Sequence, residues 1–215
     1  MAKVTTRKVI DAETREKALS VIKEVYLKEK KWINNSETEI SEDIASSQKV
    51  SWYLAEVDGD PAGVIRLVYD PNLNFPPDFE VSLNEDIDFE YIKKNFKIVD
   101  IGRFMILPKY RKKIMVALRL MKAAITEVVK RDYTHFITDV FEGEVNSPLH
   151  FHTNILGFEI IGKHVHGELN CSCTRIILAL DILKTYKRIK EKRGKVYKFL
   201  TKGLGDLLEK RLKRI

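Results

Sequence analysis

The sequence predicts an α/β fold: one domain, followed by a basic helical extension at the C-terminus. Three observations predict it. The chain has 215 residues and 44% hydrophobic content, which is enough for one substantial core. Strand-like runs alternate with stretches whose apolar residues recur at helical spacing. Residues 184–215 hold 13 Lys and Arg against three acidic residues, so we expect the domain over 1–183 and the tail over 184–215.

The first third of the chain predicts a strand, two helices and a hairpin, in that order. The strand, residues 4–10, alternates between apolar and polar side chains. Asp11 can then cap a helix over 12–30, and a shorter helix follows at 39–47. The Asp58-Gly59 turn between two strand-like runs indicates a β-hairpin. Its strands are expected at residues 52–57 and 62–69.

Residues 70–96 interrupt this rhythm. They contain three prolines and several Asn and Asp residues, and we interpret them as a long functional loop. Strand, helix, strand, helix and two strands then follow. The helix at 110–131 is the clearest in the sequence, because its apolar residues form a single stripe. These six elements are expected at residues 98–107, 110–131, 136–140, 146–155, 157–165 and 170–182.

Composition excludes several classes of protein. The net charge of +7 resides in the tail, so the domain lacks the positive field of a duplex-binding protein and we expect no nucleic-acid partner. Cys171 and Cys173 are expected on one face of a strand, too close in sequence to form a staple, which fits a reducing cytoplasm. The N-terminus has no apolar signal core, and no apolar run approaches the ~20 residues of a spanning helix. We therefore expect a cytoplasmic protein.

The tail predicts one or two amphipathic helices, interrupted by Gly194, Gly203 and Gly205. Two interpretations stay open. The basic tail lies on anionic lipid, as a peripheral contact at the inner membrane surface. Alternatively, its leucine face packs on the core as an additional helix.

Three segments resemble those of a known superfamily. The first is the strand and turn at 99–113, the second is Asn146 followed by Leu156-Gly157-Phe158-Glu159, and the third is the hairpin at 56–66. With the order of elements over residues 4–182, these segments resemble the GCN5-related N-acetyltransferase (GNAT) superfamily. The resemblance implies a mixed, mostly antiparallel central sheet flanked by helices. It also implies an acyl carrier held at the N-terminus of the helix that follows the central strand.

Three further features resemble the branch that contains long-chain N-acyl amino acid synthases and acyl-homoserine-lactone synthases. They are residues 25–33, the proline-containing insertion at 74–79, and the acidic residue two positions before Gly102-Arg103. Members of this branch use fatty acyl groups on acyl carrier protein. The resemblance therefore implies an N-acyltransferase that moves a medium or long acyl group to the amino group of an amino acid or similar small amine.

The donor-binding turn departs from the superfamily pattern. GNAT proteins that bind coenzyme A usually place glycines here, which let backbone N–H groups approach the pyrophosphate. This chain has Arg111, Lys112 and Lys113 followed by Ile114, without glycine. A phosphopantetheine arm brings only one phosphodiester, so we expect acyl-ACP as co-substrate, with acyl-CoA as the alternative. Carrier proteins are acidic, so the three bases would guide docking; alternatively, they belong to an ordinary solvated helical turn.

Acyl transfer to an amine needs a base for the ammonium group and a proton source for the leaving thiolate. Asp100 is the candidate base; the alternative is an ion pair between Asp100 and Arg103 or Lys97. Arg103 would bind the acceptor's carboxylate if a bulge at Gly102 turned it toward the cleft. A structural ion pair is the alternative for Arg103.

The superfamily's usual acid is a Tyr shortly before Gly-Phe, and this chain has none there. Counting back from Gly157 gives Thr153, whereas one extra residue gives His152. We prefer His152, with His150 second, because imidazole protonates a thiolate near neutral pH; the alternative is a polar helix residue facing solvent. The resemblance also implies that the oxyanion is stabilised by main-chain N–H groups among Met105, Ile106 and Leu107.

No metal is expected. His164, His166, Cys171 and Cys173 lack the spacing of a metal motif and are better explained as alternating strand side chains. Two other functions stay open. One is an acetyl-CoA-dependent N-acetyltransferase, and the other is a catalytically inactive GNAT-fold module that binds acyl groups or a membrane.

Overall fold

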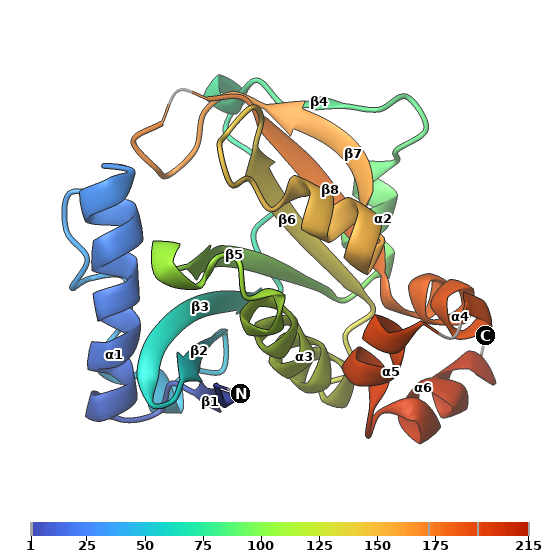
Figure 1. The fold of residues 1–215 in the computed structure, drawn as a ribbon. Coiled ribbons are helices and arrows are strands. Elements are labelled where there is room, and N and C mark those ends of the chain that lie inside the picture. Colours follow the sequence, from blue (N-terminus) through green and yellow to red (C-terminus); the bar gives the residue numbers. More distant parts are fainter. Residues whose placement is uncertain (1, 172, 193, 215) are drawn as a thin grey trace. The chain divides into compact units, whose positions relative to one another are not determined.

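The computed structural model describes residues 2–171, 173–192 and 194–214 (Figure 1). Its eight strands follow the order β1-β2-β3-β5-β6-β8-β7-β4. The β5–β6 pair is parallel, whereas β1–β2, β2–β3, β4–β7, β6–β8 and β7–β8 are antiparallel. The mixed, mostly antiparallel sheet with flanking helices is therefore confirmed. The chain forms two compact units, unit 1 (residues 1–69 and 101–127) and unit 2 (residues 70–100 and 128–215).

Unit 1 begins as the sequence predicts. Asp11 caps the first helix by accepting a hydrogen bond from the Thr14 N–H, at 2.8 Å. The hairpin turns at Asp58 and Gly59, which both have positive φ, at +53° and +92°. The helix changes to π geometry after Ile22. The bounds are β1 Val4–Lys8, α1 Ala12–Ile22, a π-helix Lys23–Glu29, β2 Val50–Val57 and β3 Asp60–Tyr69.

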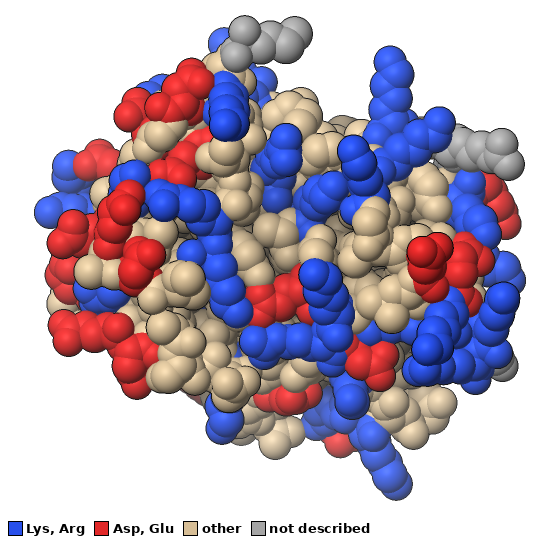
Figure 2. Space-filling view, turned by 90° about the horizontal axis from the view of Figure 1, so that it is seen from below, with Lys and Arg blue, Asp and Glu red and all other residues tan. Residues whose placement is uncertain are grey.

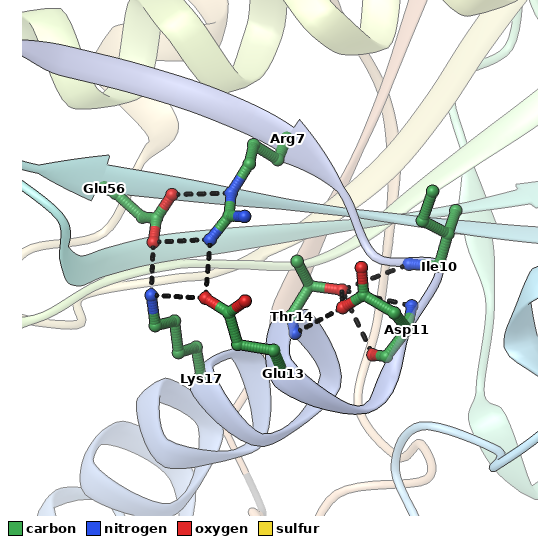
Figure 3. A network of polar contacts seen from close by, with 7 residues as sticks. All are labelled: Arg7, Ile10, Asp11, Glu13, Thr14, Lys17 and Glu56. Carbon is green, nitrogen blue, oxygen red and sulfur yellow. Dashed lines mark hydrogen bonds and ion pairs between the residues drawn. The ribbon is translucent and has the colours of Figure 1, made fainter.

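A charged network ties these elements together at the start of unit 1 (Figure 3). Glu56 on β2 is buried and accepts hydrogen bonds from Arg7 and Lys17. Loss of hydration alone would raise the pKa of Glu56, but hydrogen bonds from Arg7 and Lys17 bring the pKa below its ordinary value. Glu56 is therefore held as a carboxylate.

The rest of unit 1 contains most of β5 (Ile98–Ile106) and of α3 (Ile114–Lys130). Gly63 on β3 permits close packing here, because an added Cβ would lie 2.8 Å from the Met105 carbonyl oxygen and 3.2 Å from Leu120 of α3. The helix expected from residue 110 begins only at Ile114. A 3-10 turn, Pro108–Tyr110, precedes it, and Pro108 starts that turn.

Unit 2 contains the strands β4, β6, β7 and β8. Residues 70–96, expected to be a loop, include the strand β4 and the helix α2, which Asp88 caps by accepting from the Tyr91 N–H at 2.8 Å. Phe89 of α2 packs with Ile98, Ile137 and Ile177 on one face of the strands. The segment therefore covers a sheet face. The bounds are β4 Ser82–Leu83, α2 Phe89–Asn95, β6 His135–Phe141, a π-helix Phe151–Leu156, β7 Glu159–His164 and β8 Arg175–Asp181.

Two further expectations about elements are wrong. The helix expected at 39–47 is only a 3-10 turn, Ile44–Ser46. The Ser46 hydroxyl donates to the Asp43 carbonyl at 2.8 Å, and such local bonds compete with a helix. The strand expected from residue 170 begins at Arg175, so Cys171 and Cys173 precede it and are not neighbours on a strand face.

The tail folds as three helices within unit 2. Leu200, Leu204 and Leu208 are buried, which matches the second interpretation of the tail. Arg211 is also buried and donates to the carbonyl of Val129, in the last turn of α3, and to that of Tyr133, which follows the helix. Lys and Arg side chains gather in Figure 2 on the side where these helices lie in Figure 1. The bounds are α4 Ile182–Lys192, α5 Lys195–Thr201 and α6 Gly205–Leu212.

No helix among the described residues has the length and apolar character needed to cross a membrane.

Candidate active site

Strand β5 bends at the residue that the sequence singles out. Arg103 has a φ of +50°, in the left-handed region that non-glycine residues rarely occupy. Gly102 precedes it, and the Arg66 guanidinium fills the space where a Gly102 side chain would lie. The backbone of β5 is thus irregular at Arg103, the residue after the Gly102 at which we expect a bulge. Strained backbone of this kind concentrates at functional sites.

The Arg103 side chain turns into unit 1 and is buried. Its Nε donates to Glu39 Oε2 at 2.7 Å and its Nη2 to Oε1 at 3.3 Å. The guanidinium also lies over the Tyr26 ring, 5.5 Å from the centroid, and Tyr26 packs edge-on against Trp32. An internal carboxylate thus occupies the bidentate fork that we expected to hold the acceptor.

The predicted donor-binding bases, Arg111, Lys112 and Lys113, lie in the loop between β5 and α3. Arg111 pairs with both oxygens of Glu29, at 2.8 and 2.5 Å, and its Nε donates to the Ile106 carbonyl. The hydrogen bond from Arg111 lowers the pKa of the Glu29 carboxyl despite its partial burial. Lys112 and Lys113 are exposed. Of the three bases, the two lysines carry the exposed charge.

The start of α3 offers free backbone donors. Within the described part of the chain, the N–H groups of Ile114 and Met115 make no hydrogen bond, as expected for a first helical turn. The side chains of Ile114 and Met115 are 48% and 37% exposed, whereas Val116 is fully buried. Val116 therefore does not obstruct the helix N-terminus. A phosphate group suits such an N-terminus, because it accepts hydrogen bonds and carries negative charge.

Three main-chain N–H groups were expected to stabilise the oxyanion. The Leu107 N–H already donates to the Ala62 carbonyl, at 2.9 Å. Met105 is buried and Ile106 is partly exposed. The Leu107 N–H is thus already engaged.

Asp100 lies in unit 2, at the last residue of β5 that pairs with β6. The register matches Asp100 with Ile137, and its side chain is partly exposed. The recorded pairing of the two strands covers only Ile98 to Asp100, although β5 continues to Ile106. Asp100 therefore stands where the parallel pairing ends.

His152 also belongs to unit 2, on the π-helix Phe151–Leu156. In a π-helix the hydrogen bonds join residues five apart instead of four, and the Gly157 N–H accordingly donates to the His152 carbonyl at 2.9 Å as well as to that of Thr153. The His152 ring is 1% exposed, lies edge-on to Phe158, and bonds through Nδ1 to the Pro148 carbonyl at 2.9 Å. His150 is exposed and Thr153 is partly exposed.

Burial lowers the pKa of His152 to about 4, although its hydrogen bond to Pro148 opposes the shift. The ring is therefore neutral near pH 7. Because the carbonyl can only accept, Nδ1 carries the proton and Nε2 does not. In this state His152 accepts a proton more readily than it donates one, which counts against the acid role.

Unit 1 thus brings together Arg103 with Tyr26 and Glu39, and Arg111 with Glu29. Asp100 and His152 lie in unit 2, Asp100 on strand β5 and His152 on the π-helix Phe151–Leu156. Sequence reasoning missed both glutamates. Glu29 falls within the segment 25–33 that carried the family resemblance, and this placement was the available signal.

A metal centre finds no support in the described residues, which contain no group of three His, Cys, Asp or Glu side chains placed to hold a metal ion. His164 lies on β7, whereas His166, Cys171 and Cys173 lie in the loop that follows. The alternating-strand explanation is therefore wrong for the last three.

Comparison with known proteins adds a family to this geometry. The profile of the family described as "N-acyl amino acid synthase FeeM" matches residues 17–174, more than half of the chain. The chain has no match among curated proteins.

Solved structures resemble the fold at low sequence identity. FeeM, an N-acyl amino acid synthase from uncultured soil microbes, has a TM-score of 0.61 and 14% identity, over 87% of this chain and 95% of that chain. An acetyltransferase of the GNAT family from Streptococcus pneumoniae has a TM-score of 0.56 and 14% identity, over 84% and 99%. An acyl-CoA N-acyltransferase from Pseudomonas aeruginosa has 0.53 and 14%, over 83% and 99%. The fold is therefore the GNAT fold.

Proposed function

Because the chain belongs to the FeeM family of N-acyl amino acid synthases and is thus an N-acyltransferase, we propose that it transfers a medium or long acyl group from acyl carrier protein to the amino group of an amino acid. Acyl-CoA is the alternative donor. The observation that carries the choice of donor is the start of α3.

Three properties of that helix start favour a carrier protein. The free N–H groups of Ile114 and Met115 suit a single phosphodiester. The exposed side chains of these two residues offer an apolar contact, and Lys112 and Lys113 beside them attract an acidic partner. Arg111 contributes less, because Glu29 neutralises it.

The catalytic roles are proposals of the same kind. Asp100, at the end of the β5–β6 pairing, accepts the proton of the substrate ammonium. The acid role of His152 stays a prediction, and it requires donor binding to raise a pKa that burial holds at about 4. Main-chain N–H groups of Met105 and Ile106 remain the candidates for stabilising the oxyanion. Arg103 can bind an acceptor carboxylate only if that carboxylate displaces Glu39 from its guanidinium.

A cytoplasmic location with peripheral membrane contact through the tail also stays a prediction. The buried Leu200, Leu204 and Leu208 are not available to enter a bilayer. Contact would then depend on the exposed bases alone, and it would weaken as salt is added. Liposome binding that persists after deletion of 184–215 would refute the role of the tail.

The donor is tested by kinetics with one acyl chain presented on carrier protein or on coenzyme A. We expect a higher kcat/KM for acyl-ACP, and a loss of about tenfold or more for acyl-ACP in Lys112→Glu/Lys113→Glu at low salt. Lys94→Glu, an exposed lysine of α2, is the matched control and keeps the wild-type value. Equal losses with both donors would contradict docking by a carrier protein.

The other two functions give different results in the same assay. Consumption of acetyl-CoA with small amines, without transfer of longer chains, identifies an acetyltransferase. Absence of turnover with every donor, together with co-purified lipid, identifies an inactive acyl-binding module.

A further inference from the structure

A second charged cluster lies on strands β6, β7 and β8 of unit 2. Asp139 Oδ2 accepts from Arg175 Nη1 at 3.2 Å and from His164 Nε2 at 3.1 Å. The other ring nitrogen of His164 bonds to the His166 carbonyl at 2.7 Å. Both ring nitrogens of His164 are thus engaged within the cluster, and Arg175 is its permanent cation.

Arg175 is the member with unused donors. Its side chain is 5% exposed, and its Nη1 alone holds Asp139. Among residues 2–171, 173–192 and 194–214, its buried Nε and Nη2 have no hydrogen-bond partner. A guanidinium stays charged in proteins, and buried N–H groups without acceptors are costly. An acceptor at this fork would therefore be strongly favoured.

The geometry of the unused donors specifies the acceptor. Nε and Nη2 form the side-on fork of a guanidinium, which matches the two oxygens of a carboxylate. Arg103 uses the same two atoms to hold Glu39. The ring of Phe141 lies 4.8 Å from Arg175 Cζ, so the fork is set against an apolar wall.

The fork lies on the same sheet face as the proposed base. Asp100 pairs with Ile137, and Asp139 is two residues further along β6, so both carboxylates point to one face. Two residues of rise and one strand spacing separate their Cα atoms by about 8 Å. The same face carries Ile137 and Ile177, which pack under Phe89, so an acceptor that meets both Asp100 and Arg175 must pass the edge of this cluster.

We propose that Arg175, in place of Arg103, binds the α-carboxylate of the acceptor amino acid. The proposal rests on the proposed function, and it names the group that recognises the acceptor. Asp139 is a positioning residue. Loss of hydration alone would raise the pKa of Asp139, but the His164 hydrogen bond and the Arg175 charge hold that pKa below its ordinary value. It therefore stays ionised and fixes the guanidinium.

The test compares a free amino acid with its amide, which lacks the carboxylate charge. In the wild type we expect the ratio of the two kcat/KM values to be about a hundred or more, because a site built for a polar group rejects analogues without it. Arg175→Lys keeps the charge and loses the fork, and the ratio should fall toward one. Lys163→Gln, at the neighbouring exposed position of β7, is the control and keeps the wild-type ratio.

A second variant covers the case in which Arg175→Lys does not fold. A Cβ at Gly167 would lie 2.2 Å from Arg175 Nη1, so Gly167→Ala displaces the flexible guanidinium without removing it. The ratio should fall here too. A wild-type ratio near one, or an unchanged ratio in both variants, overturns the proposal.

Calorimetry separates this proposal from the proposed function. If the wild type acylates no amine, the proposed function fails, yet binding of the free amino acid is still measurable. Binding that weakens at least tenfold in Gly167→Ala supports the fork, and equal binding overturns it. Inorganic phosphate is the second probe: competition as strong as that of the amino acid would overturn the carboxylate assignment.

Discussion

The pair formed by Glu39 and Arg103 can be tested by a double-mutant cycle with Glu39→Gln and Arg103→Met. Only 7% of the Arg103 side chain and 13% of the Glu39 side chain are exposed, and two hydrogen bonds join them. Removing one member of a buried pair costs about 3 to 5 kcal/mol, because the other charge stays desolvated. Glu39→Gln keeps one acceptor, so we expect about 3 kcal/mol. Arg103→Met should also cost about 3 kcal/mol, and the double variant about 4 kcal/mol, which gives a coupling of about 2 kcal/mol.

Urea unfolding followed by tryptophan fluorescence measures this cycle, because Trp32 packs on the Tyr26 ring that Arg103 covers. The matched control is the pair Glu142–Lys163, whose side chains are 44% and 52% exposed. Its coupling should stay below about 0.5 kcal/mol. If the Glu39–Arg103 coupling were no larger than that of the control, the pair would not hold this part of unit 1 together, and the argument from burial would be refuted.

Three further outcomes are expected, each measured by urea unfolding. Leu208→Ala should cost about 2 to 4 kcal/mol because Leu208 is 2% exposed, whereas the partly exposed Leu207→Ala should cost less than about 1 kcal/mol; equal costs would refute the packed tail. The folded-state pKa of Glu56 is depressed, so the ionised Glu56 stabilises the fold at pH values above the ordinary pKa of a glutamate, and this stabilisation is lost as the pH falls below that value. In Glu56→Gln the free energy of unfolding should therefore vary less with pH between about pH 5 and 3. The folded-state pKa of His152 is about 4, so only the unfolded state takes up its proton between pH 6.5 and 4; stability should fall across that range, and an equal fall in His152→Gln would reject the burial of a neutral ring.

Local chemistry accounts for what the sequence predicts correctly. Asp11 caps its helix because a carboxylate at that position reaches the N–H three residues on. The Asp58-Gly59 turn adopts positive φ at both residues, as two-residue hairpins require. The apolar stripe of α3 begins at Ile114, where the helix begins. Each of these signals depends on residues close together in the chain, so it can be recognised from the sequence alone.

The errors arise where neighbours in sequence are poor guides. Asp88 is a good cap, but the prolines before it suggested a loop, and α2 forms because Phe89 joins an apolar cluster with Ile98 and Ile177. The helix expected at 39–47 does not form; Ile40 and Ile44 are instead buried around a 3-10 turn. Burial against distant residues decided both cases.

The same distinction between local and distant residues applies to the candidate site. Chemistry-bearing residues on β5 could be named from the sequence, because the strand and its turn are contiguous. Their partners could not: Glu39 is 64 residues from Arg103, and Glu29 is 82 residues from Arg111. A π-helix at His152 was equally invisible, since apolar spacing over one turn does not distinguish it from an α-helix.

The internal carboxylates indicate which arginines are available to a substrate. Arg103 and Arg111 each hold both oxygens of a glutamate, so a substrate anion would have to replace a bidentate pair with another of similar strength. Such an exchange gains little, and it leaves a glutamate to be accommodated elsewhere. Arg175 holds its carboxylate through one nitrogen and keeps its side-on fork. By the same reasoning, Lys112 and Lys113 are better placed than Arg111 to meet an acidic carrier. Binding energy is gained where the protein has not already supplied the counterion.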